Sequence, residues 1–94
     1  MAIFAVNLTF TSDTDKRLAT RPTHREYLKT LLDAGKLVES GPFTDDSGAL
    51  MVYEAPDLAA AEAQLAADPY AQAGGIIERS TINEWNIVMT RHAS

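Results

Sequence analysis

The stretch "KLVESGPFTDDSGALMVYEA" (residues 36–55) decides the fold of this chain. Its centre, residues 44–48, holds the Asp, Ser and Gly residues that favour a tight turn. The residues on either side, 36–43 and 49–55, have the composition of two strands. We therefore predict a β-hairpin, in which Asp45 and Asp46 are turn residues.

The segment before the hairpin is predicted to be an amphipathic helix. Pro22 suits the first turn of a helix, where its missing N–H is not needed, and Gly35 is the usual stop residue. At helical spacing, Tyr27, Leu28 and Leu31 share one face with His24, and charged residues occupy the other face. Residues 11–20 are polar, and we interpret them as a connection that could include a helical turn.

The segment after the hairpin is also predicted to be helical. Asp57 is a good N-cap for residues 58–67, which are rich in alanine. Asp68 can cap a further short turn with Pro69 at its first position.

The two ends of the chain are predicted to be strands, over residues 2–10 and 76–90. Phe4, Val6, Leu8 and Phe10 alternate with the other residues of the first strand, so that one of its faces is wholly apolar. The resulting order is β-α-β-β-α-β. Right-handed crossovers then place both helices on one face of an antiparallel four-stranded sheet. We predict a single α+β domain of the ferredoxin-like type over residues 1–94.

Composition narrows the functional classes. The chain has no cysteine, which excludes disulfides, thiol catalysis and Cys-based metal sites. It has no apolar run near the ~20 residues that span a bilayer, and its first residues lack the features of a signal peptide, so we expect a cytoplasmic protein with no membrane partner. A formal net charge of −5 argues against a nucleic-acid partner.

Arg17, Arg21 and Arg25 recur every four residues, but acidic residues lie among them. We interpret this region as a solvated segment of mixed charge. A small anionic substrate near Arg21 is left open.

The predicted topology gathers three polar segments at one rim of the sheet. The start of the first helix, the end of the second strand and the end of the second helix all lie at the same end of the sheet. His24, residues 40–42 and Asp68 should therefore meet. An imidazole paired with a carboxylate has a fixed tautomer and a more basic ring, so its second nitrogen can act as a general base.

Each of these residues also has a purely structural interpretation. A lone His on an apolar face is often a core residue, and the N-cap alone explains Asp68. Gly41 and Pro42 could end a strand or let the backbone face a ligand, and Ser40 is interpreted as a hydrogen-bonding residue rather than a nucleophile. No His or carboxylate spacing matches a metal site, and His92 lies in the tail, so neither metal nor cofactor is expected.

Three blocks of the sequence resemble the YciI-like family, also called YCII-related or DGPF-type. They are "KRLATRPTHREYLKTLLDAGKLVESGPF" (16–43), "LAAAEAQLAADPYAQAGGI" (58–76) and the "EW" of the last strand (84–85). The resemblance implies a dimeric α+β barrel of ferredoxin-like subunits, similar to muconolactone isomerase. It also implies a cleft whose His–Asp dyad maps onto His24 and Asp68. One branch of the family removes chloride from chlorinated hydroxyhydroquinones.

We therefore expect a cofactor-free enzyme of the lyase or isomerase type that acts on a small cyclic or aromatic molecule. His24 and Asp68 are the candidate catalytic residues. The candidate substrate-binding residues are Arg21, Ser40, Gly41, Pro42 and Tyr70. The alternatives are a non-catalytic or regulatory module that binds a metabolite in the same cleft, and a dimerisation domain with a merely structural dyad. We also expect a homodimer, because the helices leave Ile3 and Ala5 uncovered on the other face of the sheet.

Overall fold

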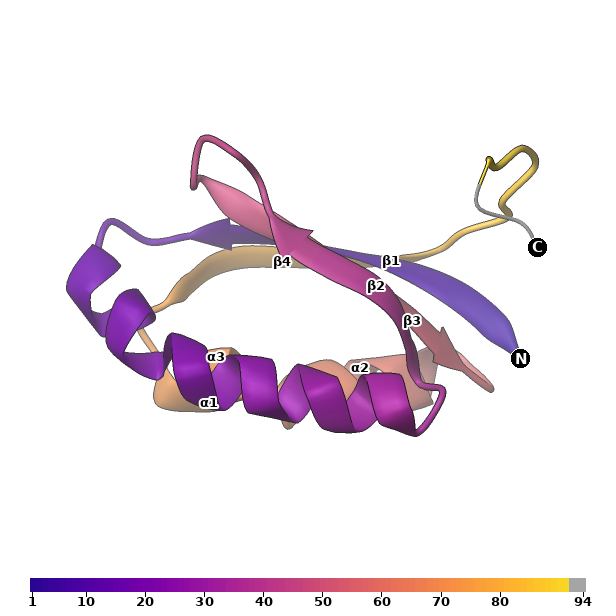
Figure 1. The fold of residues 1–94 in the computed structure, drawn as a ribbon, viewed down its shortest axis with the longest axis horizontal. Coiled ribbons are helices and arrows are strands. Elements are labelled where there is room, and N and C mark those ends of the chain that lie inside the picture. The colour runs from indigo at the N-terminus through magenta and orange to yellow at the C-terminus, as the bar shows by residue number, and fades with distance from the viewer. Residues whose placement is uncertain (92–94) are drawn as a thin grey trace.

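The computed structural model describes residues 1–91 of the 94-residue chain. In chain order, the elements are β1 (Ala2–Phe10), α1 (Thr14–Asp33), β2 (Leu37–Pro42), β3 (Gly48–Ala55), α2 (Leu58–Ala66), α3 (Pro69–Ala73) and β4 (Ile77–Glu84). The strands form one antiparallel sheet in the order β2-β3-β1-β4, with the helices of this part of the chain on one side of it (Figure 1). This is the predicted ferredoxin-like α+β fold, and that prediction is confirmed.

The strand β1 is central, and its alternate residues build the core. It pairs with β3 on one side and with β4 on the other. Phe4, Val6 and Leu8 are at most 1% exposed and pack in one cluster with buried residues of α1 and α2. Burying an apolar side chain of this size contributes about 1.5–3 kcal/mol, so this one face of β1 attaches the helices to the sheet.

The helix α1 begins eight residues before the predicted start at Pro22, so the interpretation of residues 11–20 as a connection was wrong. Asp13 caps the helix by accepting a hydrogen bond from the Lys16 N–H. Pro22 lies inside the helix, where it removes a single backbone hydrogen bond. The cap at Asp13 and the burial of Arg17 in the second turn favour the longer helix over a break at Pro22.

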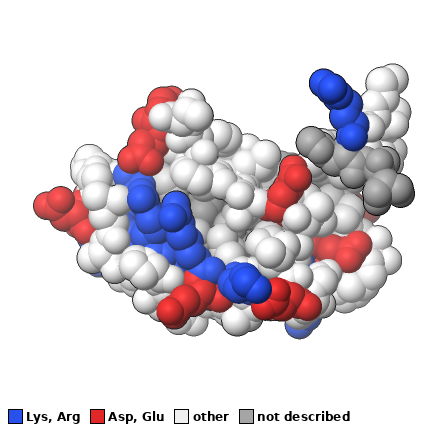
Figure 2. All heavy atoms as spheres, viewed as in Figure 1, with Lys and Arg blue, Asp and Glu red and all other residues white. Residues whose placement is uncertain are grey.

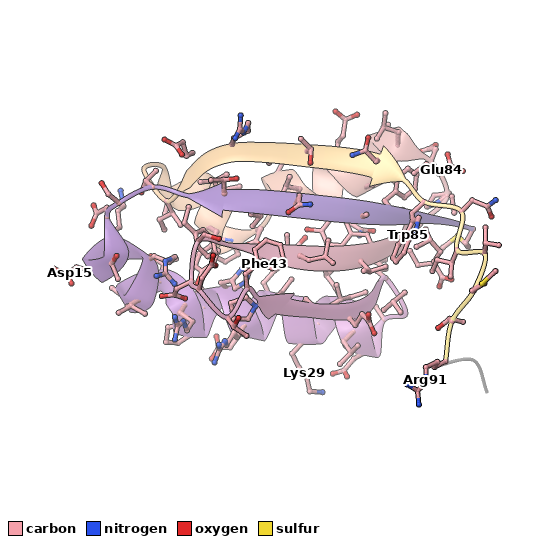
Figure 3. The ribbon with its side chains drawn as sticks, turned by 90° about the horizontal axis from the view of Figure 1, so that it is seen from above. Asp15, Lys29, Phe43, Glu84, Trp85 and Arg91 are labelled. Carbon is pink, nitrogen blue, oxygen red and sulfur yellow. The ribbon has the colours of Figure 1, made fainter. Side chains whose placement is uncertain are left out.

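The last strand is shorter than predicted. β4 ends at Glu84, and the predicted extension to residue 90 was wrong. The Trp85 N–H still donates to the Ile3 carbonyl, but β1 begins at Ala2, so no neighbouring strand is left to pair with the following residues. Figure 3 shows Trp85 at this end of the sheet, where the chain turns away toward Arg91.

The predicted start of α2 and the predicted end of α1 are confirmed. Asp57 caps α2 by accepting from the Ala60 N–H, and Gly35 follows α1 with a positive φ of 75°. Within residues 1–91, each helix is too short or too polar to span a lipid bilayer.

We predict that Gly48→Ala destabilises the fold by about 1–3 kcal/mol, the usual cost of overpacking. A methyl group on Gly48 would overlap with the Leu8 carbonyl in the neighbouring strand, so β1 and β3 would have to separate there. The control is Gly41→Ala on the edge strand β2, where the added methyl meets no atom within 4 Å. Urea unfolding of both variants measures the difference, and equal stabilities would contradict this account of the β1–β3 contact.

Candidate active site

A pocket of about 330 Å³ lies between α1 and the β2–β3 hairpin. Its walls are mostly apolar, formed by Phe10, Leu28, Leu32, Leu37, Pro42, Ala49, Met51 and Tyr70. Its polar lining comes from the α1 residues Arg17, Arg21, His24, Arg25 and Lys29 and from Ser40 on β2. A cavity of this size and composition suits a small, largely apolar molecule with few polar groups.

His24 and Asp68 form a buried pair at the back of this pocket. The His24 Nδ1 atom lies 2.7 Å from Asp68 Oδ1, and the two side chains are 9% and 0% exposed. The predicted contact between them is confirmed. Asp68 does not line the pocket itself but lies behind the His24 ring.

Asp68 holds its position because it also caps α3. Its Oδ1 atom accepts a second hydrogen bond, 2.9 Å long, from the Tyr70 N–H. Pro69, which has no N–H, occupies the first position of α3, so the Tyr70 N–H is the donor that the cap serves. The same oxygen atom of Asp68 therefore caps α3 and contacts the His24 ring.

Tyr70 fixes the plane of the His24 ring. The two rings are stacked, with centroids 3.8 Å apart and an interplanar angle of 4°. Tyr70 is held in turn by an edge-to-face contact with Phe10 at 5.7 Å. The His24 ring is thus fixed at one nitrogen by a hydrogen bond and across its face by an aromatic side chain.

The second ring nitrogen of His24 is available to a ligand. A carboxylate oxygen accepts hydrogen bonds, so the neutral tautomer that fits this contact has its proton on Nδ1 and a lone pair on Nε2. Nε2 has no hydrogen-bond partner within residues 1–91, and it is not completely buried. Since His24 lines the pocket, Nε2 retains access from that side.

The Asp68 carboxylate places negative charge inside the core. Its Oδ2 atom is buried and has no hydrogen-bond partner within residues 1–91. Burial raises the pKa of Tyr27 and of Tyr53, and the nearby Asp68 charge raises both pKa values further. Both phenols therefore stay neutral near pH 7. Within residues 1–91, His24 is the one basic side chain that contacts Asp68.

The structure gathers the other predicted residues in the same pocket. Arg21, Ser40, Gly41, Pro42 and Tyr70 all line it. Their roles toward a ligand stay predictions. Among residues 1–91, no group of three or more His, Asp or Glu side chains is arranged to hold a metal ion, and His92 lies outside the described residues.

The sequence interpretation missed part of the basic lining. Arg17 was expected in a solvated segment, but it is 3% exposed. Its guanidinium forms two hydrogen bonds with the Asp46 carboxylate, of 2.7 and 3.3 Å, and lies over the Phe10 ring. The bonds from Arg17 hold the pKa of Asp46 below its usual value. The four-residue spacing of the arginines was the available signal, because it places them on one side of α1.

A family model described as YCII-related domain matches residues 2–86 of this chain. The protein YciI of Escherichia coli O6:H1 and that of Shigella flexneri are each 39% identical over 70 residues, which cover 64% of this chain and 71% of each relative.

Among solved structures, the chain resembles the 5-chloro-2-hydroxyhydroquinone dehydrochlorinase of Burkholderia phenoliruptrix, determined in complex with 2,5-dihydroxybenzoquinone. The TM-score is 0.78 at 21% identity, and the match covers 89% of this chain and 93% of the other. A likeness at this identity supports the shared fold.

We predict that Asp68→Ala and Asp68→Asn differ in stability. Asp68→Ala removes the acceptor of both the Tyr70 N–H and the His24 Nδ1–H, and should cost about 2–4 kcal/mol. Asp68→Asn keeps an oxygen acceptor at the same place and should cost no more than about 1 kcal/mol. Urea unfolding near pH 7 checks both values. Equal losses would show that the carboxylate charge, rather than the shared acceptor, holds α1 and α3 together.

Proposed function

This chain belongs to the YCII-related domain family, and on that basis we propose that it is a cofactor-free enzyme of the lyase or isomerase type acting on a small cyclic or aromatic substrate. The observation that carries the proposal is the 2.7 Å contact between His24 Nδ1 and Asp68 Oδ1 behind a mostly apolar pocket. A buried ring fixed at one nitrogen and accessible at the other is the arrangement that a general base requires.

In the proposed reaction, His24 Nε2 takes a proton from a carbon or hydroxyl group of the bound ring. The electron pair of the broken bond stays on the substrate, and the imidazole becomes an imidazolium. The Asp68 carboxylate stabilises that positive charge across the 2.7 Å contact. In an isomerase the proton returns to another atom of the substrate. In a lyase the electron pair expels a leaving anion, and the proton passes to water.

The remaining lining residues would bind and orient the substrate. The apolar walls and Tyr70 would contact the ring, while Arg21, Ser40 and the backbone at Gly41 would bind its oxygen atoms. The neighbour from Burkholderia phenoliruptrix is a dehydrochlorinase complexed with a substituted benzoquinone, and a ring of that kind is the substrate class we propose here. The cytoplasmic location expected from the sequence stays a prediction.

We predict that His24→Gln strongly reduces turnover and preserves the fold. General-base catalysis contributes about 10²–10⁴-fold, so the rate should fall by at least two orders of magnitude. The assay incubates the protein in D₂O with a panel of hydroxylated quinones and unsaturated lactones, and follows product formation and deuterium incorporation by NMR. Asp68→Asn keeps the cap oxygen but removes the charge, so it should retain the fold and lose part of the rate.

The same panel tests the alternative of a binding module. Ligands that bind the wild-type protein but undergo neither conversion nor exchange, and that lose only affinity in His24→Gln, would contradict the enzyme proposal.

We also propose that the protein is a homodimer. The face of the sheet opposite the helices carries Ile3, Ala5 and Leu50, which are partly exposed in one chain. Beside it, Trp85, Ile87, Val88 and Met89 are between 40% and 89% exposed. Apolar surface of this kind on an antiparallel sheet is commonly buried against a second sheet.

We predict a mass near twice the 10.2 kDa of one chain when light scattering is measured at micromolar concentration. Trp85→Glu should shift the mass toward the monomer, because it places a charge in the expected interface. Phe43→Glu is the matched control, since Phe43 is 40% exposed but belongs to the hairpin turn. A stable wild-type mass near 10.2 kDa would overturn the dimer.

A further inference from the structure

The pocket is electrically unlike the rest of the molecule. The chain has a formal net charge of −5, yet the pocket is lined by Arg17, Arg21, Arg25 and Lys29 and, among residues 1–91, by no Asp or Glu. Figure 2 shows the basic side chains as a band along α1 beside a hollow of the surface. The charge at the pocket is therefore opposite in sign to that of the whole protein.

Two of these four cations are already neutralised. Arg17 is paired with Asp46 at 2.7 Å, and Lys29 with Asp33 at 2.7 Å. Figure 3 shows the Lys29 side chain extending outward from α1. These two groups need no further anion.

Arg21 and Arg25 have no such partner. Neither makes a side-chain hydrogen bond or an ion pair within residues 1–91, although the charge of Arg21 contributes to lowering the pKa of Asp46. They lie one turn apart on α1, where two like charges destabilise a helix. Both line the same cavity as His24, the residue immediately before Arg25. The repulsion between them is relieved when an anion lies between the two guanidinium groups.

We propose that Arg21 and Arg25 bind a carboxylate carried by the substrate ring, so that the pocket selects cyclic or aromatic carboxylates over neutral rings of the same shape. The planar guanidinium group matches a carboxylate with two parallel hydrogen bonds. The apolar wall formed by Leu28, Leu37 and Met51 then contacts the ring. The placement of the ring against His24 rests on the proposed proton-transfer function, whereas the selection for a carboxylate rests on the two unpaired arginines alone.

The test compares benzoate with benzamide, which has nearly the same shape but no charge, in NMR titrations of the backbone amides. We expect the wild-type protein to bind benzoate at least about tenfold more tightly, with the largest shifts at the amides of residues that line the pocket, Ser40 and Gly41 among them. The double variant Arg21→Gln/Arg25→Gln should bind benzoate about as weakly as benzamide. Lys36→Gln makes a unit change in charge outside the pocket lining and should leave the benzoate affinity within about twofold.

Arg25→Gln alone carries the test if the double variant is unstable, because Arg25 is exposed. Equal binding of the two probes by the wild-type protein, no binding of benzoate, or an unchanged benzoate affinity in the arginine variants would each overturn the proposal. These results are independent of turnover. A wild-type protein that shows no preference for benzoate over benzamide but catalyses a His24-dependent reaction would overturn this inference alone. A clear wild-type preference with no His24-dependent reaction would overturn only the proposed enzyme activity.

Discussion

Asp68 Oδ1 accepts two hydrogen bonds in the interior, one from the Tyr70 N–H that opens α3 and one from the His24 ring on α1. This shared acceptor connects segments that are 44 residues apart in sequence. α3 begins at Pro69 with Asp68 as its cap, and the next residue, Tyr70, stacks on the His24 ring. The cap and the stacking therefore both hold the Asp68 oxygen beside the His24 ring. A substitution at His24 therefore alters one of the two hydrogen bonds made by Asp68 Oδ1, while the bond from the Tyr70 N–H remains.

The His24–Asp68 contact could be predicted from sequence although the start of α1 was misplaced. The prediction depended on direction, because α1 runs opposite to β1 and α2 runs parallel to β1, so an early part of the first helix was expected beside the end of α2. In the longer helix His24 lies at the middle of α1, and the contact is made with the residue that caps α3. The alternation in β1 and the caps at Asp57 and Asp68 were equally readable, since each depends on residues close together in the chain.

What the sequence interpretation missed depends on contacts between distant segments. The burial of Arg17 requires Asp46, 29 residues away, and no local pattern shows that the hairpin turn reaches α1. The end of β4 depends on where β1 begins, because a strand without a neighbour loses its hydrogen bonds. Pro22 suits the first turn of a helix, and the residues that extend α1 before it are stabilised by the cap at Asp13 and by the burial of Arg17.

The contact between Arg17 and Asp46 has a further consequence for how the pocket can vary. It attaches the tip of the β2–β3 hairpin to the second turn of α1, and Asp46 itself adopts a left-handed backbone conformation with φ of 67°. The two residues that would carry out the chemistry lie elsewhere: His24 is on α1, and Asp68 directly precedes α3. The hairpin turn contributes neither of them. Insertions or substitutions in this turn would change the width of the pocket while leaving the proton-transfer residues in place, so relatives with the same dyad could admit ligands of different size.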